Sequence, residues 1–139
     1  MTQTPVDLPH ANTIHASLGI RTIEFTPDKV VLEMDVGPKV HQLFGLLHGG
    51  ASAVIAESAA SMGAYLNCDP ATEYVVGIDL NVSHLRAKSD GFVRATALPV
   101  RKGRTIHVWT IDIEGDDGKT VAVARCTLAI RPTRQPGRA

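Results

Sequence analysis

The chain has 139 residues, the length of one domain that can bury a core of its own, and we expect residues 1–139 to form a single domain. Its 14 Lys and Arg residues balance 14 Asp and Glu residues, and only 4% of its residues are aromatic, so its composition does not favour a nucleic-acid partner. No secretory signal pattern and no run of about 20 apolar residues occurs, which predicts a cytoplasmic protein without membrane contact. Cys68 and Cys126 lack C-x-x-C spacing and are expected to be free thiols.

Both ends of the chain are polar and contain prolines. Residues 1–9 and the tail after Arg131 are therefore expected to be loose, around a core of about residues 18–131. Residues 11–18 predict a short helix that ends at Gly19, because glycine suits a helix C-cap. Residues 20–26 and 29–36 then predict two strands around a Pro-Asp turn, and the pair forms a hairpin.

The stretch from Val40 to Cys68 predicts one buried helix with a reactive entrance. Residues 39–47 are expected to form a loop before the helix, and residues 67–72 a loop after it. From Ala51 to Leu66 it has no Lys, Arg or Pro, and small or apolar side chains occupy nearly every position, so we expect the helix to be enclosed. One face is expected to be a groove of small residues, namely Gly50, Ala53, Val54, Ala60 and Ala64. The opposite face carries residues expected to pack on a sheet, namely Ile55, Ala59, Met62 and Leu66.

Glu57 is the one carboxylate in this run, and burying it without a partner would cost several kcal/mol. It shares the small-residue face with Ser61, so a ligand can lie beside the carboxylate. At the helix start, Gly49 and Gly50 follow His48, and free backbone N–H groups at the positive end of the helix dipole suit a carbonyl oxygen that gains negative charge. Gly49 and Glu57 are roughly 12 Å apart along a helix axis. If both act on one acyl group, Glu57 must come from a second copy of the chain, which predicts an active dimer.

Four more strands are predicted after the helix, at residues 74–85, 92–100, 105–114 and 120–130. Turn signals separate them at residues 89–91, 102–103 and 115–118. A strand pair, a helix and four strands predict an α+β protein in which an antiparallel sheet wraps around one long helix. The turn at Arg101, Lys102 and Arg104 is strongly basic and suits phosphate groups, although a solvated hairpin tip is the alternative interpretation.

Residues 42–61, Q-L-F-G-L-L-H-G-G-A-S-A-V-I-A-E-S-A-A-S, resemble the hotdog-fold acyl-CoA thioesterases. The similarity covers about residues 18–130 and is to the branch that contains 4-hydroxybenzoyl-CoA thioesterase of the Glu type, 1,4-dihydroxy-2-naphthoyl-CoA thioesterase and the enterobactin-pathway proofreading thioesterase. It implies a hotdog fold and hydrolysis of a small acyl- or aroyl-CoA to the free acid and CoA. It also implies a homodimer, often a dimer of dimers, with no cofactor, since coenzyme A is part of the substrate.

The resemblance also assigns roles to single residues. Glu57 matches the family's carboxylate, which acts as a nucleophile that forms an acyl anhydride or as a base for a water molecule. Gly49 matches the backbone N–H that receives the oxyanion, while Gln42 and His48 match positions that line the thioester. Ser61 would lie beside Glu57 and the acyl group. The other substrate-binding residues that we expect are Gly50, Asn81, His84 and Arg86, with His84 near the acyl portion and the basic turn near the nucleotide.

Each of these assignments has a structural alternative. Glu57 could be a structural carboxylate paired with a Lys or Arg, Gly49 and Gly50 could only permit a tight turn, His48 could only begin the helix, and Ser61 could be a packing residue. Two other functions also remain open. A hotdog enoyl-thioester hydratase or dehydratase would place its acid/base pair differently, and a non-catalytic acyl-thioester binder would tolerate loss of the carboxylate.

A metal site is the rival use of the six histidines. They form no H-x-x-x-H or H-x-H pair, so we expect no metal. The identity of the acyl group, the choice between CoA and acyl carrier protein as thiol carrier, and the choice between dimer and tetramer are left open by the sequence.

Overall fold

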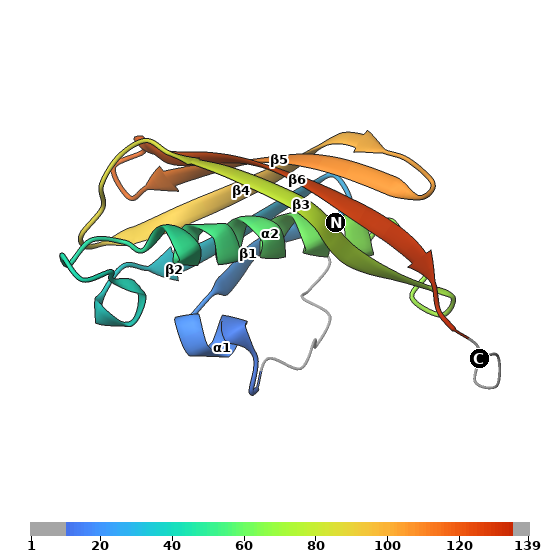
Figure 1. The fold of residues 1–139 in the computed structure, drawn as a ribbon, viewed down its shortest axis with the longest axis horizontal. Coiled ribbons are helices and arrows are strands. Elements are labelled where there is room, and N and C mark those ends of the chain that lie inside the picture. Colours follow the sequence, from blue (N-terminus) through green and yellow to red (C-terminus); the bar gives the residue numbers. More distant parts are fainter. Residues whose placement is uncertain (1–10, 135–139) are drawn as a thin grey trace.

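The structure, a computed structural model, describes residues 11–134 and has a six-stranded antiparallel sheet that curves around one long helix (Figure 1). The helices are α1 (Ile14–Leu18), the short 3-10 helix η1 (Pro38–Val40) and α2 (Gly49–Tyr65). The strands are β1 (Arg21–Thr26), β2 (Lys29–Asp35), β3 (Glu73–His84), β4 (Phe92–Lys102), β5 (Ile106–Gly115) and β6 (Thr120–Pro132). This arrangement confirms the predicted α+β class and the hotdog fold.

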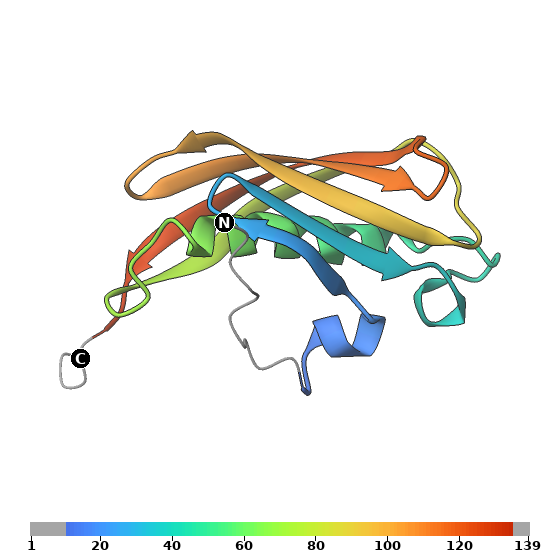
Figure 2. The same cartoon turned by 180° about the vertical axis from the view of Figure 1, so that it is seen from behind.

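The strands follow the order β1-β2-β4-β5-β6-β3, so β1 and β3 form the two edges of the sheet. The predicted β1–β2 hairpin is present, and β4, β5 and β6 follow one another as antiparallel neighbours. β3 precedes β4 in the chain but pairs with β6 at the far edge of the sheet. The helix α2 lies against the inner face of the sheet (Figure 2).

The short N-terminal helix begins at Ile14, later than the predicted residue 11, because the Thr13 hydroxyl caps it by accepting a hydrogen bond from the Ala16 N–H at 3.3 Å. It ends at Gly19, which has a left-handed φ of 68° as the predicted C-cap requires. The predicted loose ends fall mostly outside the described residues. No helix within residues 11–134 is long and apolar enough to cross a membrane.

The core lies between the inner face of the sheet and one side of α2. Trp109 on β5 is fully buried, and its ring lies so close to Gly63 that a Cβ there would come within 2.6 Å of Cζ3. A large side chain on the sheet thus requires small residues on the facing side of the helix. The buried positions of α2 are accordingly small apart from Ile55: Ala51, Ser52, Ile55, Ala56, Ala59, Ala60, Gly63 and Ala64.

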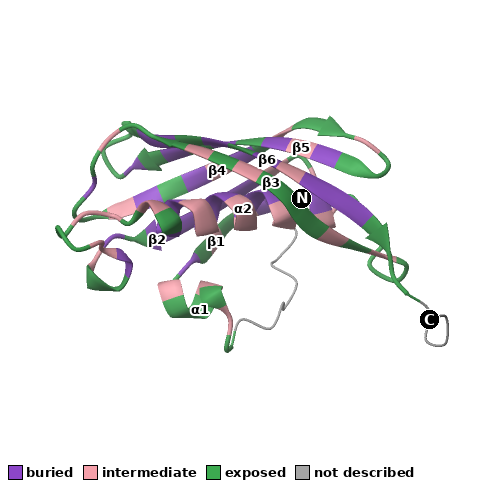
Figure 3. Ribbon diagram, in the orientation of Figure 1, coloured by how far each residue is buried: buried purple, intermediate pink, exposed green. Residues whose placement is uncertain are grey.

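This packing corrects the predicted faces of α2. Ala60 and Ala64, expected in the open groove, are fully buried against the sheet, whereas Met62 and Leu66, expected on the sheet, are only partly buried. The prediction that the helix is enclosed is also wrong for the single chain, because the sheet covers only one side. The other side, with Val54, Glu57, Ser61, Met62 and Tyr65, is half-buried (Figure 3).

Candidate active site

The N-terminus of α2 leaves one backbone N–H for a ligand. The Nδ1 atom of His48 accepts a hydrogen bond from the Gly50 N–H at 2.7 Å, so His48 caps the helix with its own side chain. The His48 carbonyl accepts hydrogen bonds from Ala51 and Ser52 at 2.9 and 3.3 Å. No hydrogen bond within residues 11–134 uses the Gly49 N–H as its donor. Of the two predicted glycines, it is therefore Gly49 that presents a free donor at the positive end of the helix.

The cap also decides the proton position on His48. Because Nδ1 accepts a hydrogen bond, the neutral ring carries its proton on Nε2 and can donate from that atom. His48 is exposed, so this donor faces outward at the entrance of the helix.

His84, at the end of β3, lies directly beside this helix start. A Cβ added to Gly49 would come within 2.9 Å of His84 Nε2 and 3.0 Å of Cε1. Only a residue without a side chain allows the imidazole to approach the free N–H so closely. The structure thus brings Gly49 and His84 together, although they are far apart in the sequence.

Gln42 is held at the same place by a tight loop. Its side-chain Oε1 accepts hydrogen bonds from the N–H groups of Phe44 and Leu46, and its own N–H donates to the Leu46 carbonyl at 2.7 Å. The Gln42 amide nitrogen remains as a donor. Together with Gly49 and His84, Gln42 lines a cavity of about 370 Å³.

Glu57 lies eight residues further along α2 and does not line this cavity. Its Oε1 rests against the backbone of Gly77 on β3, so closely that a Cβ at Gly77 would overlap it. No ion pair within residues 11–134 involves Glu57, so the structure offers no support for the structural alternative in which a Lys or Arg neutralises it. Ser61, one turn later, lines a second cavity of about 450 Å³ with Met62, Tyr65 and Tyr74.

The predicted site residues therefore form two groups in one chain. The first group, Gln42, Gly49 and His84, surrounds the cavity at the start of α2, and the second, Glu57 and Ser61, lies further along the same helix. A single helix cannot present both groups to one carbonyl, as the spacing predicted.

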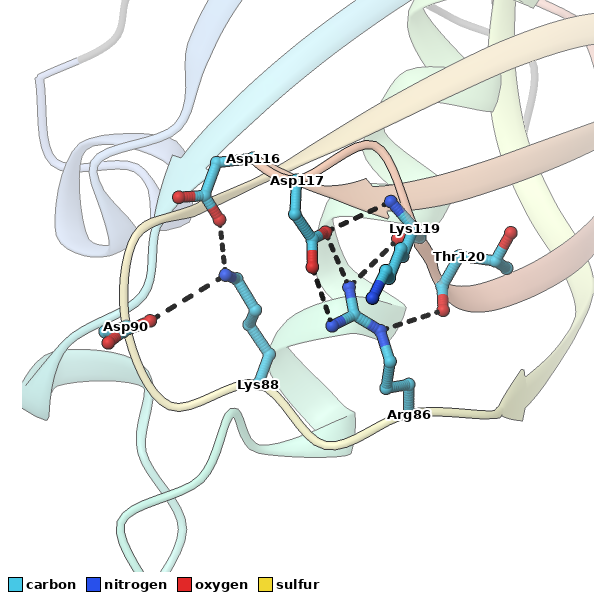
Figure 4. A network of polar contacts seen from close by, with 7 residues as sticks. All are labelled: Arg86, Lys88, Asp90, Asp116, Asp117, Lys119 and Thr120. Atoms are coloured by element: carbon cyan, nitrogen blue, oxygen red, sulfur yellow. Dashed lines mark hydrogen bonds and ion pairs between the residues drawn. The ribbon is translucent and has the colours of Figure 1, made fainter.

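Arg86 also borders the first cavity, but its guanidinium is engaged within the chain (Figure 4). It donates to both carboxylate oxygens of Asp117, at 2.8 and 3.0 Å, and to the Lys119 and Thr120 carbonyls. The Lys119 N–H and this guanidinium together hold the pKa of Asp117 below its ordinary value. In this arrangement Arg86 anchors the segment after β3 to the β5–β6 turn.

Lys88 forms the second anchor of that segment. Its Nζ donates to Asp116 and lies 3.8 Å from Asp90, and the pair with Asp116 raises the pKa of Lys88 and lowers that of Asp116 (Figure 4). The Lys88 carbonyl accepts a hydrogen bond from the Leu47 N–H at 2.7 Å, just before His48 and Gly49. The sequence did not point to Lys88, because its partner Asp116 is 28 residues away.

Asn81 lies apart from the other predicted residues. The register of β3 with β6 shifts between Gly77 and Asp79, which makes Ile78 the extra residue of a β-bulge. After the bulge, His84 pairs with the buried Ala122 and faces α2, whereas Asn81 pairs with the exposed Arg125 on the outer face of the sheet.

The basic turn lies at the opposite end of the molecule from Gly49, beside the C-terminal end of α2 (Figures 1 and 2). Lys102 forms an ion pair with Asp28, in the β1–β2 turn. Arg101 and Arg104 form no ion pair within the described residues.

The sheet curves around one central helix, and solved thioesterase structures share this fold. The protein is therefore of the class of hotdog-fold thioester hydrolases. The chain belongs to the thioesterase superfamily, whose family model matches residues 44–122.

Individual relatives agree with this assignment. The crystal structure of a mutant of thioesterase PA1618 from Pseudomonas aeruginosa superposes with a TM-score of 0.85 at 46% identity, covering 88% of each chain. A 1,4-dihydroxy-2-naphthoyl-CoA hydrolase from Listeria monocytogenes is 39% identical over 88% of this chain and 98% of its own length. The proofreading thioesterase EntH from Cronobacter turicensis is 36% identical over 94% of each chain.

Proposed function

We propose that the chain is an acyl-CoA thioesterase that hydrolyses a small acyl- or aroyl-CoA to the free acid and CoA. The observation that carries the proposal is the Gly49 N–H beside His84 and Gln42, with the Glu57 carboxylate on the same helix, neither of which has a partner among residues 11–134. The similarity to a naphthoyl-CoA hydrolase supports an aromatic acyl group. The reaction needs no cofactor, because coenzyme A enters with the substrate.

The substrate carbonyl oxygen accepts a hydrogen bond from the Gly49 N–H, where the helix dipole stabilises its negative charge. Gln42 and His48 each have an N–H donor that can orient the thioester or a water molecule. Hydrolysis of the thioester then follows one of two routes. In the first, Glu57 attacks the carbonyl carbon and the C–S bond breaks, which gives an acyl anhydride and a thiolate that takes a proton from solvent. Water then cleaves the anhydride, which releases the acid, regenerates the Glu57 carboxylate and returns a proton to solvent. In the second, Glu57 takes a proton from the attacking water as the C–S bond breaks, and the thiolate receives it.

The site is completed by a second chain. If Gly49 of one chain faces Glu57 of another, two-fold symmetry pairs the same residues in reverse, so the two α2 helices run antiparallel. The basic turn, beside the C-terminal end of α2, then lies toward the partner's Gly49 end. Arg101 and Arg104 are placed to contact the nucleotide of a substrate bound there. This symmetry makes a homodimer the smallest active unit, and a dimer of dimers keeps both sites intact.

Replacing the carboxylate tests the proposal most directly. Glu57→Gln keeps the shape and removes the charge, so kcat should fall by about 10²-fold or more while substrate binding survives. The assay measures thiol release from benzoyl-, phenylacetyl-, hydroxynaphthoyl- and straight-chain acyl-CoA. The matched pantetheine thioesters, which lack the nucleotide, should show a higher KM and a similar kcat. A Glu57→Gln variant within about threefold of the wild-type rate would remove the central group of this mechanism.

A further inference from the structure

The Glu57 carboxylate lies against the backbone of Gly77 on β3. A Cβ added at Gly77 would overlap Glu57 Oε1 and come within 3.1 Å of Cδ and 3.8 Å of Cγ, so the three nearest heavy atoms outside the neighbouring residues of β3 all belong to Glu57. Oε1 therefore occupies the space that a side chain at Gly77 would fill. Glycine inside a strand lowers stability, and close approach of another group is a common reason for it.

The regular pairing of β3 with β6 is interrupted directly after Gly77. The β-bulge that follows Gly77 adds Ile78 to β3 and turns Asp79 toward the outer face, opposite Thr127. Without the bulge, strict alternation would place the Asp79 carboxylate on the inner face two residues after Gly77, on the side of Glu57. The bulge thus leaves an inner surface beside Glu57 that has neither a side chain at position 77 nor a second carboxylate from position 79.

We infer that Gly77 is a positioning residue, whose missing side chain fixes where the Glu57 carboxylate lies against β3. The inference rests on the proposed function, in which Glu57 acts on the thioester. Glu57 is only half-buried, and the side of α2 that carries it is open in the single chain. A methyl group at Gly77 would therefore displace the end of a flexible side chain, and the strand could stay in place. The group that must move is the reactive carboxylate itself.

Gly77→Ala should therefore lower kcat and leave the stability of the fold nearly unchanged. Moving a reacting group by about 1 Å can cost on the order of 10²-fold, so kcat should fall by about that factor with little change in KM. The thermal unfolding midpoint should remain close to that of the control variant Gly37→Ala. At Gly37 the backbone is extended and an added Cβ would meet nothing within 4 Å. The control therefore makes the same change of residue type without a contact, and its kcat should match the wild type.

A shorter carboxylate side chain at position 57 distinguishes positioning of Glu57 from a general effect of Gly77→Ala on β3. Glu57→Asp withdraws the carboxylate by about 1 Å, so adding Gly77→Ala to that variant should change kcat by less than about threefold. An equal loss in both backgrounds, or wild-type kcat in Gly77→Ala alone, would overturn the inference. If Gly77→Ala does not fold, Glu57→Asp should restore folding, and failure to restore it would also overturn the inference. A Glu57→Gln variant with wild-type activity would instead defeat the proposed function, whatever Gly77→Ala does.

Discussion

His107 is a buried titratable residue at the far end of α2 from the Gly49 cavity. Its side chain is 2% exposed, and its Nδ1 accepts a hydrogen bond from Trp109 Nε1 at 3.3 Å. Burial lowers the pKa of His107 below its ordinary value of 6.5, and the nearby charge of Lys102 lowers it further, against a smaller opposing effect of the Gly103 backbone. The folded protein therefore holds this imidazole neutral where the unfolded chain would take up a proton.

This difference makes stability depend on pH in a defined direction. Below pH 6.5 the unfolded chain binds a proton at His107 that the folded chain does not, so the free energy of unfolding should decrease as the pH falls from 7.5 to 5.5. His107→Asn offers an oxygen to Trp109 without titrating in this range, so its stability should fall less over the same interval. Urea unfolding of both proteins at one protein concentration measures the difference. Equal pH dependence of the two proteins would contradict the assignment.

Part of the proposed site could be predicted from helix spacing, which places Glu57 and Ser61 on one face and separates both from Gly49. Gln42 and His48 were predicted only through the resemblance to the family. The resemblance assigned the oxyanion role to the Gly49 N–H, but local spacing could not choose between Gly49 and Gly50, because that choice depends on how the His48 side chain turns. Gly77 carried a weak signal, a glycine inside a predicted strand, which often marks the close approach of another group.

Among the elements, β3 is the strand in which alternation along the sequence does not predict which side chains face the helix. The long helix and the strands follow from apolar patterns, and their predicted ranges agree closely with those observed. The bulge at Ile78 breaks the alternation of β3 and reverses which of Asn81 and His84 faces the helix. Bulges depend on pairing with another strand, here β6, so a local pattern does not reveal them.

The segment after β3 is the element that supports the Gly49 end of the site. Arg86 and Lys88 fasten it to the β5–β6 turn, and the Lys88 carbonyl supports the chain just before His48 (Figure 4). Both ion pairs join residues about thirty positions apart, which no local motif predicts. The pairs fix the position of the segment that lines the cavity beside His84.

Removing the Lys88 charge should loosen this support. In Lys88→Met the Asp116 carboxylate loses its partner, and we expect kcat to fall by about tenfold through misplacement of the Gly49 end. Lys88→Arg should recover most of the rate, because a guanidinium can also donate to Asp116. Lys119→Met is the matched control, since Lys119 lies on the same turn but contributes only backbone groups to the network. A Lys88→Met rate equal to that of Lys119→Met would mean that the ion pair does not position the site.

As a whole, the single chain leaves apolar surface open where the proposed partner would bind. β3 is an edge strand with exposed Tyr74, Val76 and Ile78, and the half-buried side of α2 that carries Glu57 faces outward beside it (Figure 3). Unpaired edge strands readily pair with another chain. A second copy that covered this side would enclose α2, as its composition predicted, and would bring Glu57 near the partner's Gly49.

A site shared between two chains can be tested by mixing two inactive variants. Glu57→Ala removes the carboxylate, and Gly49→Val places a side chain against His84 at the oxyanion position. In a hybrid dimer, one site receives the intact Gly49 of the first variant and the intact Glu57 of the second, while the other site carries both defects. Half of the randomly formed dimers are hybrids with one active site of two, so co-expressed and co-purified chains should recover about a quarter of the wild-type activity. Glu57→Ala mixed with Glu57→Gln is the control and should recover nothing, because neither chain supplies the carboxylate. If the mixture of Glu57→Ala and Gly49→Val is no more active than its parents, Gly49 and Glu57 do not form one site across two chains, and the proposed dimeric site is wrong.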